Sequence, residues 1–321
     1  MVWEDDDLKE ANEQFSFSEL KQDKEVEDFN KQADEFDKEQ EKITFVNSSS
    51  SDLEKYFKDT IKPIAFVTLF FSDTDCGKTY PSMTFPEPIY VIDTENRAIL
   101  TKSYNFDNKA INIFEPVQFK TTFDEDNVDP FDSYKTIEQI TKFIIDFANQ
   151  VRQRKIKQGT LVIDSCTDIW TFIQDWGTIE LSKRSNKKGA RADNITGEIT
   201  TQFDWKVPNK KHFELLGILR SLIKYGIFIV FTAREEKTPD YAQQQNKNPL
   251  LKDIIRAQKD VPFLADIIIQ SVKRESQGQV KHYALIKKLR GLPVPTQMIE
   301  NISYNKIIDL IKQQKEKVDK K

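Results

Sequence analysis

The sequence lacks the features that mark secreted and membrane-spanning proteins. Its 321 residues include only two cysteines, two histidines and nine glycines. Cys76 and Cys166 cannot form a disulfide framework, so we expect a reducing, intracellular setting. No apolar run approaches the roughly 20 residues that a membrane-spanning helix needs. The first ten residues are acidic, which is unlike a secretion signal, and His212 and His282 are too few and too separate for a metal site.

Charge is distributed unevenly along the chain. Residues 1–42 carry 16 Asp or Glu and 6 Lys, a net charge of −10, whereas the whole chain has a net charge of −4. The remainder is therefore mildly basic, at +6. Such a polar leader is typical of a solvated helix or a disordered segment, or of an acidic arm that docks on a basic surface of this or another protein. We take residues 1–52 as an acidic N-terminal extension and linker.

From residue 53 on, short apolar segments alternate with amphipathic ones. This pattern is typical of an α/β fold with a mostly parallel sheet and helices on both faces. We therefore predict an α/β core over residues 53–300, and a C-terminal helix with a Lys-rich tail over 301–321. The expected strands are Ile64–Phe71, Ile89–Ile92, Ile111–Phe114, Thr160–Ile163, Ile227–Phe231 and the antiparallel pair Ala265–Val272 and His282–Ile286. The expected helices are Leu53–Asp59, Thr136–Arg152, Phe213–Leu222 and Asn305–Gln314.

The most informative segment follows the first expected strand and ends in Gly77-Lys78-Thr79. A buried strand that runs into such a loop is the layout of a phosphate-binding P-loop. Backbone N–H groups face an anion, the lysine reaches the β- and γ-phosphates, and the threonine hydroxyl holds Mg²⁺. Pro81 is tolerated only in a first turn, so the following helix should be short. The predicted nucleotide-binding residues are Ser72, Asp73, Thr74, Asp75, Cys76, Gly77, Lys78 and Thr79.

Two carboxylates follow later strands and could complete such a site. The apolar strand from Thr160 ends at Asp164, where an acidic residue can organise the water shell of Mg²⁺. Glu95 closely follows the strand Ile89–Ile92, and it is placed to orient a water that attacks the γ-phosphate. The alternative for this second segment is an acidic turn in which Asp93 caps the residues that follow.

The order of these segments resembles the core of RecA-like ATPases. It is most similar to the RecA-like AAA nucleotide-binding proteins of phages and archaeal viruses, which act in DNA recombination and replication. Four further segments carry the resemblance, which covers about residues 60–300. They are Phe85–Asn96, Asp204-Trp205 with Asn209, Phe213 and Leu216, the strand Ile229–Glu235, and Lys287–Gly291.

The resemblance implies a role for each matching residue. Lys288 and Arg290 would reach the nucleotide of a neighbouring subunit and stabilise transition-state charge, and the alternative for both is a solvated basic strand end. The implied cofactors are ATP and Mg²⁺, and contacts from a neighbour imply a homo-oligomer, either a ring or a filament. Within one chain, the resemblance assigns Gly77, Lys78 and Thr79 to phosphates and Mg²⁺, Glu95 to water activation, Asp164 to the metal and Thr232 to sensing the γ-phosphate.

The P-loop departs from the usual pattern G-x-x-x-x-G-K-[ST]. Ser72 replaces the first glycine, so a tight turn must form without the residue that tolerates any φ. Asp73 and Asp75 place negative charge beside the phosphates, and Arg234 stands where many relatives have a histidine. Weak nucleotide binding, or binding without hydrolysis, is therefore an open alternative.

A basic segment, Ser182–Arg191, lies between Asp164 and the helix expected at Phe213. In RecA-like proteins, loops in this part of the chain face a central DNA channel. The resemblance thus implies a mobile loop that binds nucleic acid, most simply single-stranded DNA, in a salt-sensitive and sequence-tolerant way. The alternative is a solvated surface loop, and the acidic leader could compete for the same surface. The residues concerned are Lys183, Arg184, Lys187, Lys188 and Arg191.

The sequence therefore predicts an intracellular RecA-like ATPase of a virus or mobile element, acting on DNA in recombination, replication or repair. Two alternatives remain open. One is a degenerate P-loop protein that does not hydrolyse ATP and serves as a structural or assembly subunit. The other is a genome-packaging ATPase.

Overall fold

A computed structural model describes residues 65–120, 130–187, 204–236, 254–276 and 278–320 of the chain. These residues all belong to one compact unit, Lys62–Lys321, and in them nine strands form one sheet. The strands are β1 (Val67–Ser72), β2 (Ile89–Asp93), β3 (Ile111–Phe114), β4 (Gly159–Asp164), β5 (Ile227–Glu235), β6 (Ile255–Arg256), β7 (Ile267–Ser276), β8 (Gln279–Leu289) and β9 (Ile299–Glu300). The helices are α4 (Thr79–Ser82), α5 (Ala98–Asn105), α6 (Ser133–Arg152), α7 (Cys166–Lys187), α8 (Lys206–Ile223), α11 (Val261–Leu264) and α12 (Tyr304–Asp319).

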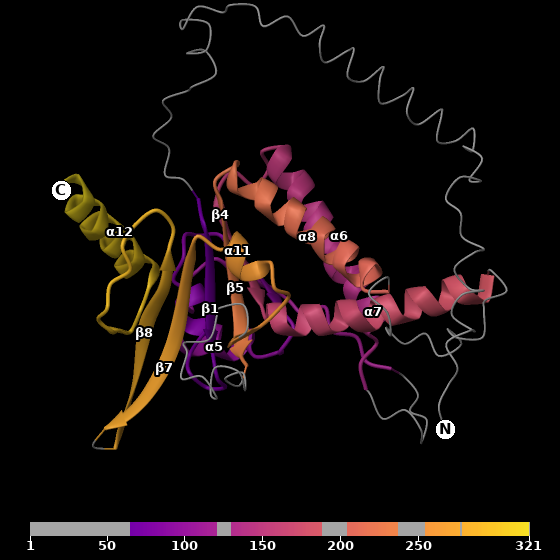
Figure 1. Ribbon diagram of the computed structural model, residues 1–321, viewed down its shortest axis with the longest axis horizontal. Coiled ribbons are helices and arrows are strands. Elements are labelled where there is room, and N and C mark those ends of the chain that lie inside the picture. The colour runs from indigo at the N-terminus through magenta and orange to yellow at the C-terminus, as the bar shows by residue number, and fades with distance from the viewer. Residues whose placement is uncertain (1–64, 121–129, 188–203, 237–253, 277, 321) are drawn as a thin grey trace, which may run out of the picture. The chain divides into compact units, whose positions relative to one another are not determined.

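The strand order is β3-β2-β4-β5-β1-β7-β8-β9, with the short β6 on the end of β5. The six strands from β3 to β7 are parallel, so their carboxyl ends share one edge of the sheet. β7 and β8 pair antiparallel, as predicted, and form the long hairpin visible in Figure 1. β1 lies where the chain changes direction across the sheet, with β2 to β5 on one side and β7 to β9 on the other. Open α/β sheets bind their ligands at the carboxyl edge of such a switch point.

Helices cover both faces of this sheet because the strands are apolar on both faces. In β1, Leu69 and Phe71 belong to the apolar cluster that includes α6, α7 and α8, whereas Phe70 belongs to the cluster on the opposite face, with α5 and α12. All three side chains are fully buried. Figure 1 shows α6 and α8 side by side, and α12 beside β8. The predicted α/β class, with a mostly parallel sheet and helices on both faces, is confirmed.

Local sequence accounts for where several helices begin. The carboxylate of Asp132 accepts a hydrogen bond from the backbone N–H of Lys135 and so caps α6. The hydroxyl of Ser303 does the same for α12 through Lys306. The helix after the P-loop, α4, has only four residues, with Pro81 as its third. The prediction of a short helix there is confirmed.

The prediction of a basic loop is wrong for residues 182–187, because these residues continue helix α7. This stretch contains no proline or glycine that would end a helix. Helix α5 was not predicted either. The acidic extension, the helix expected at Leu53–Asp59, and Lys188 and Arg191 lie outside the described residues. Within the described part of the chain, no helix has the length and apolar character needed to cross a membrane.

Candidate functional site

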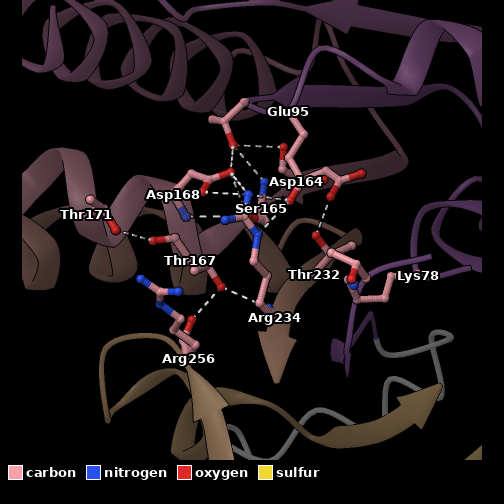
Figure 2. Close-up of polar contacts among 12 residues, drawn as sticks. Lys78, Glu95, Asp164, Ser165, Thr167, Asp168, Thr171, Thr232, Arg234 and Arg256 are labelled. Atoms are coloured by element: carbon pink, nitrogen blue, oxygen red, sulfur yellow. Dashed lines mark hydrogen bonds and ion pairs between the residues drawn. The ribbon is translucent and has the colours of Figure 1, made fainter. Parts of the chain in front are cut away.

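Three elements meet at the carboxylate of Asp164, which ends β4. The hydroxyl of Thr79, at the start of α4, donates to its Oδ2 at 2.7 Å. The hydroxyl of Thr232, on β5, donates to its Oδ1 (Figure 2). Asp164 is 3% exposed and Thr232 is fully buried. The structure thus brings the predicted P-loop, metal and sensor residues together at the carboxyl edge of the sheet.

Burial dominates the electrostatics of Asp164. Loss of solvent raises the pKa of its carboxyl from 3.8 to about 6, although the two threonine hydroxyls oppose this increase. The nearby charges of Glu95 and Asp93 raise the pKa further. A buried carboxylate with acidic neighbours is a place where a bound cation would relieve repulsion.

The atoms present fit Mg²⁺. This ion prefers oxygen ligands, keeps several waters, and usually takes one or two protein carboxylates together with substrate phosphates. Asp164 offers carboxylate oxygens, and Thr79 offers a hydroxyl that already lies 2.7 Å from one of them. Among the residues that the structure describes, no group of three or more His, Cys, Asp or Glu side chains could hold a metal ion. A metal at Asp164 would therefore take its other ligands from phosphates and water.

The P-loop backbone makes a turn that glycine permits. Gly77 has φ +78°, and a side chain there would meet the ring of His282 at 3.2 Å from its Nδ1. Asp75 also has positive φ, +57°, a conformation that Asp tolerates better than most residues. The loop that begins after Ser72 therefore turns without the missing first glycine.

Internal contacts occupy part of this loop. The ammonium of Lys78 donates to the carbonyls of Ser72 and Asp73, at 3.3 and 3.0 Å, and to the hydroxyl of Ser72 at 3.2 Å. The carboxylate of Asp73 accepts the backbone N–H of Thr74 at 2.7 Å. A phosphate group would have to replace these contacts, and the exposed positions of Asp73, Thr74 and Asp75 allow such a change.

Asp93 has a capping role, as the alternative for this segment suggested. Its carboxylate accepts the backbone N–H of Glu95 at 3.0 Å and that of Ala98 at 2.7 Å, which fixes the turn between β2 and α5. Burial raises the pKa of Asp93 even though these hydrogen bonds favour its charged form. The turn leaves Glu95 partly exposed at the carboxyl edge of the sheet.

Glu95 is held by an arginine. Arg234, near the end of β5, contacts Oε1 of Glu95 through Nε at 3.3 Å and through a terminal nitrogen at 3.1 Å. The same terminal nitrogen lies 3.0 Å from Oδ1 of Asp168, in the first turn of α7. Asp168 in turn accepts hydrogen bonds from Thr94 and Ser165. Figure 2 shows the side chains of Glu95, Arg234, Asp168 and Ser165 close together.

The sequence did not predict most of the contacts around Arg234 and Asp168. Burial raises the pKa of Asp168, and Arg234 opposes that increase. Arg234 was noted only as a departure from the family pattern, and Asp168 and Ser165 were not assigned roles. The available signal was the spacing in Asp164-Ser165-Cys166-Thr167-Asp168, which places two acids around the junction of β4 and α7.

Lys288 and Arg290 lie away from the P-loop of their own chain. Lys288 pairs with Ile268 near the start of β7, at the opposite edge of the sheet from Thr79. Its ammonium donates to the carbonyl of Pro262 at 2.9 Å, and Arg290 forms an ion pair with Asp266 at 2.8 Å. Burial lowers the pKa of Lys288. Their role toward a neighbouring subunit stays a prediction.

The basic residues predicted to bind nucleic acid begin on the last turns of α7. Lys183 is exposed, lies 3.2 Å from the carboxylate of Glu180, and sits 3.5 Å from the ring centre of Tyr134. Arg184 and Lys187 follow it on the same helix. Their contact with nucleic acid stays a prediction.

Comparison with solved structures gives distant structural likenesses. No protein-family model matches the chain, and no curated protein matches it. The fold is similar to the crystal structure of a KaiC-like protein from the hyperthermophilic archaeon Pyrococcus horikoshii, with 16% identity and a TM-score of 0.38. The match covers 73% of this chain and 84% of that one. So distant a likeness adds nothing to the geometry of the site.

Proposed function

We propose that the protein is a RecA-like P-loop ATPase that uses Mg²⁺ and acts on nucleic acid. The observation that carries the proposal is the meeting of Thr79, Thr232 and Asp164 beside the P-loop at the carboxyl edge of β1, β4 and β5. Phosphoryl transfer needs positioning and charge neutralisation more than covalent chemistry from the protein. These residues are of the types that supply both.

In this proposal the P-loop changes its partners when a nucleotide binds. Lys78 exchanges the carbonyls of Ser72 and Asp73 for phosphate oxygens, where its charge offsets that of the phosphates. Asp164 and Thr79 provide the protein's oxygens for the metal site. A Mg²⁺ ion held there would supply positive charge that offsets the charge on the phosphates. Thr232 contacts the same carboxylate, so its hydroxyl is positioned to respond to the γ-phosphate.

Glu95 orients the attacking water. Both of its contacts with Arg234 use the same oxygen, Oε1, so Oε2 can accept a hydrogen bond from water. Arg234 fixes the direction of the Glu95 carboxylate through these two contacts. Removing a properly placed acid–base group slows an enzyme by about 10²–10⁴-fold.

The nucleic-acid part of the proposal rests on charge. The chain from residue 43 on carries a net charge of +6, and basic residues cluster at the end of α7. We further propose a role in recombination, replication or repair for a virus or mobile element, on the similarity of the motif segments to phage and archaeal-virus proteins. Lys288 and Arg290 would act in a head-to-tail ring or filament.

A second candidate is a P-loop protein that binds nucleotide weakly or without turnover and serves as an assembly subunit. One observation favours it: Lys78 and Asp73 already satisfy polar groups of the loop itself. A protein whose loop keeps these contacts in the presence of ATP would not hydrolyse it.

One set of assays separates these functions. The test measures ATP hydrolysis with Mg²⁺, alone and with single-stranded DNA, for the wild type, Lys78→Ala and the control Lys142→Ala on the exposed face of α6. We expect DNA-stimulated turnover that Lys78→Ala abolishes and Lys142→Ala preserves. Absent turnover in a folded wild-type protein favours the assembly subunit, and dependence on duplex ends or procapsids favours a packaging motor.

A further inference from the structure

A cavity of about 450 Å³ opens beside the P-loop. Its walls come from the loop and α4, from the end of α5, from the hairpin β7–β8, and from the two residues that follow β9. Its volume lies within the range of small-molecule sites in proteins. Residues that line it include Cys76, Gly77, Tyr80, Ser271, His282 and Asn301.

The cavity lies on the opposite side of β1 from the metal and sensor residues. Asp164 and Thr232 are on β4 and β5, whereas Ser271 and His282 are on β7 and β8, and β1 separates the two groups in the sheet. A triphosphate held by the loop after β1 would thus have one end at Asp164. The other end, which carries the rest of the nucleotide, would lie over the cavity.

Ser271 is a buried hydroxyl without a partner. It is 5% exposed, and its Oγ has no hydrogen-bond partner within the described structure. An unpaired buried polar group is destabilising by about 1–3 kcal/mol, so native proteins retain few of them. A serine hydroxyl both donates and accepts, so it can bond a ring nitrogen or an exocyclic group of a planar base.

Flat side chains and the P-loop backbone frame the same space. Tyr80, His282 and Tyr283 line the cavity, and rings of this kind stack on nucleobases. Nδ1 of His282 lies 3.3 Å from the carbonyl of Cys76, which ties β8 to the P-loop. The cavity is therefore continuous with the loop that would hold phosphates.

We propose that this cavity receives the base and ribose of the bound nucleotide, and that Ser271 is its hydrogen-bonding, specificity-determining residue. This inference rests on the proposed function, because it requires a triphosphate at the P-loop. The hairpin β7–β8 then forms a wall of the nucleotide site, through Ser271 on one strand and His282 on the other.

The test compares Mg·ATP with Mg·tripolyphosphate, which has the phosphates and lacks the base. Dissociation constants are measured by calorimetry for the wild type, Ser271→Ala and Thr68→Val. Thr68 is a matched control, because its hydroxyl is also buried and unpartnered within the described structure but lies on β1 away from the cavity. We expect Ser271→Ala to weaken ATP binding about fivefold, without weakening tripolyphosphate binding and without lowering the thermal stability of the ligand-free protein. Thr68→Val should leave both affinities as in the wild type.

A bulkier variant, Ser271→Leu, narrows the cavity. It should weaken ATP at least about tenfold, because stacking of the base is lost, and it should spare tripolyphosphate. If the wild type and Ser271→Ala bind ATP equally well, the inference about the cavity is overturned. The proposed function stands in that case, provided that tripolyphosphate still binds. A wild-type protein that binds neither ligand overturns both.

Discussion

Replacing Asp164 by Asn should stabilise the ligand-free protein at alkaline pH while removing its Mg²⁺-dependent activity. The carboxylate of Asp164 is almost fully buried, and in the ligand-free protein it lies near the acids Glu95 and Asp93 without an opposing charge among its strongest interactions. Asparagine has the same shape and keeps one acceptor oxygen. Removal of the charge should therefore stabilise the ligand-free fold, because it removes a buried charge and its repulsion by Glu95 and Asp93.

The magnitude follows from the pKa of Asp164, which burial raises from 3.8 to about 6. The folded protein binds this proton more tightly than the unfolded chain, so its stability falls as pH rises from about 4 to above 6. At about 1.4 kcal/mol per pKa unit, the full effect is about 3 kcal/mol. About half of it lies between pH 5 and pH 8. For a folded unit of this size, 3 kcal/mol corresponds to about 5 °C in Tm.

Thermal unfolding of the ligand-free protein at pH 5 and pH 8 measures the effect. Asp164→Asn should raise Tm at pH 8 and reduce the loss of stability between the two pH values. Asp93→Asn is the matched control, since Asp93 is also a buried acid but accepts two backbone N–H groups. An amide would turn its NH₂ toward one of them, so this variant should be destabilised by about 1–3 kcal/mol.

The reasoning fails if Asp164→Asn lowers stability at pH 8 as much as Asp93→Asn does. That result would make Asp164 a structural acceptor for Thr79 and Thr232. It would remove the argument that the carboxylate is held ready for a cation.

Three further predictions concern the surrounding network and the leader. Arg234→Met should destabilise the protein by about 1–2 kcal/mol, because it leaves the carboxylate of Asp168 without its cation. The loss should be larger at pH 8 than at pH 5, since more of the Asp168 side chain is charged at pH 8. Thermal melts at both pH values check this, and a pH-independent loss would refute it. Glu95→Gln should bind ATP and hydrolyse it at least about 100-fold more slowly, which single-turnover assays would show as trapped ATP; wild-type turnover would exclude Glu95 from water activation. Deletion of residues 1–42 removes a net charge of −10 and should tighten single-stranded DNA binding in a fluorescence titration, and an unchanged affinity would mean that the leader does not compete.

The sheet could be predicted because its strands are short apolar runs that end in polar residues. β3 has the predicted bounds, β2 extends by one residue to include Asp93, and β4 extends by one residue at each end, to Gly159 and Asp164. The carboxyl ends of parallel strands share an edge, so the sequence also predicted that the P-loop, Asp164 and Thr232 would meet. The register between β4 and β5 then brings their ends together.

The side-chain network could not be predicted, because its members are far apart in the sequence. Arg234 and Asp168 are separated by 66 residues, and Arg234 and Glu95 by 139. Charged residues show no apolar period that would reveal their partners. The same limit applies to the basic C-terminal turns of α7, whose sequence has no apolar period that would indicate a helix.

The cavity escaped prediction for a different reason. Ser271 and His282 belong to a hairpin that was predicted correctly as an antiparallel pair, but its position in the sheet was not. Only the placement of β7 next to β1 brings these residues to the P-loop. Strand order depends on the packing of whole elements, which one sequence does not specify.

The last residues of β5 are tied to the short strand β6 by backbone pairing. Arg234 and Glu235 pair with β6, and the backbone N–H of Glu236 donates to the carbonyl of Ile254 at 2.7 Å. The hydroxyl of Thr167 accepts the backbone N–H of Arg234 and donates to the carbonyl of Arg256. Glu236 and Ile254 are thus joined to each other next to the arginine that holds Glu95. A displacement of Arg234 would therefore disturb the pairing of β5 with β6 as well as the position of Glu95.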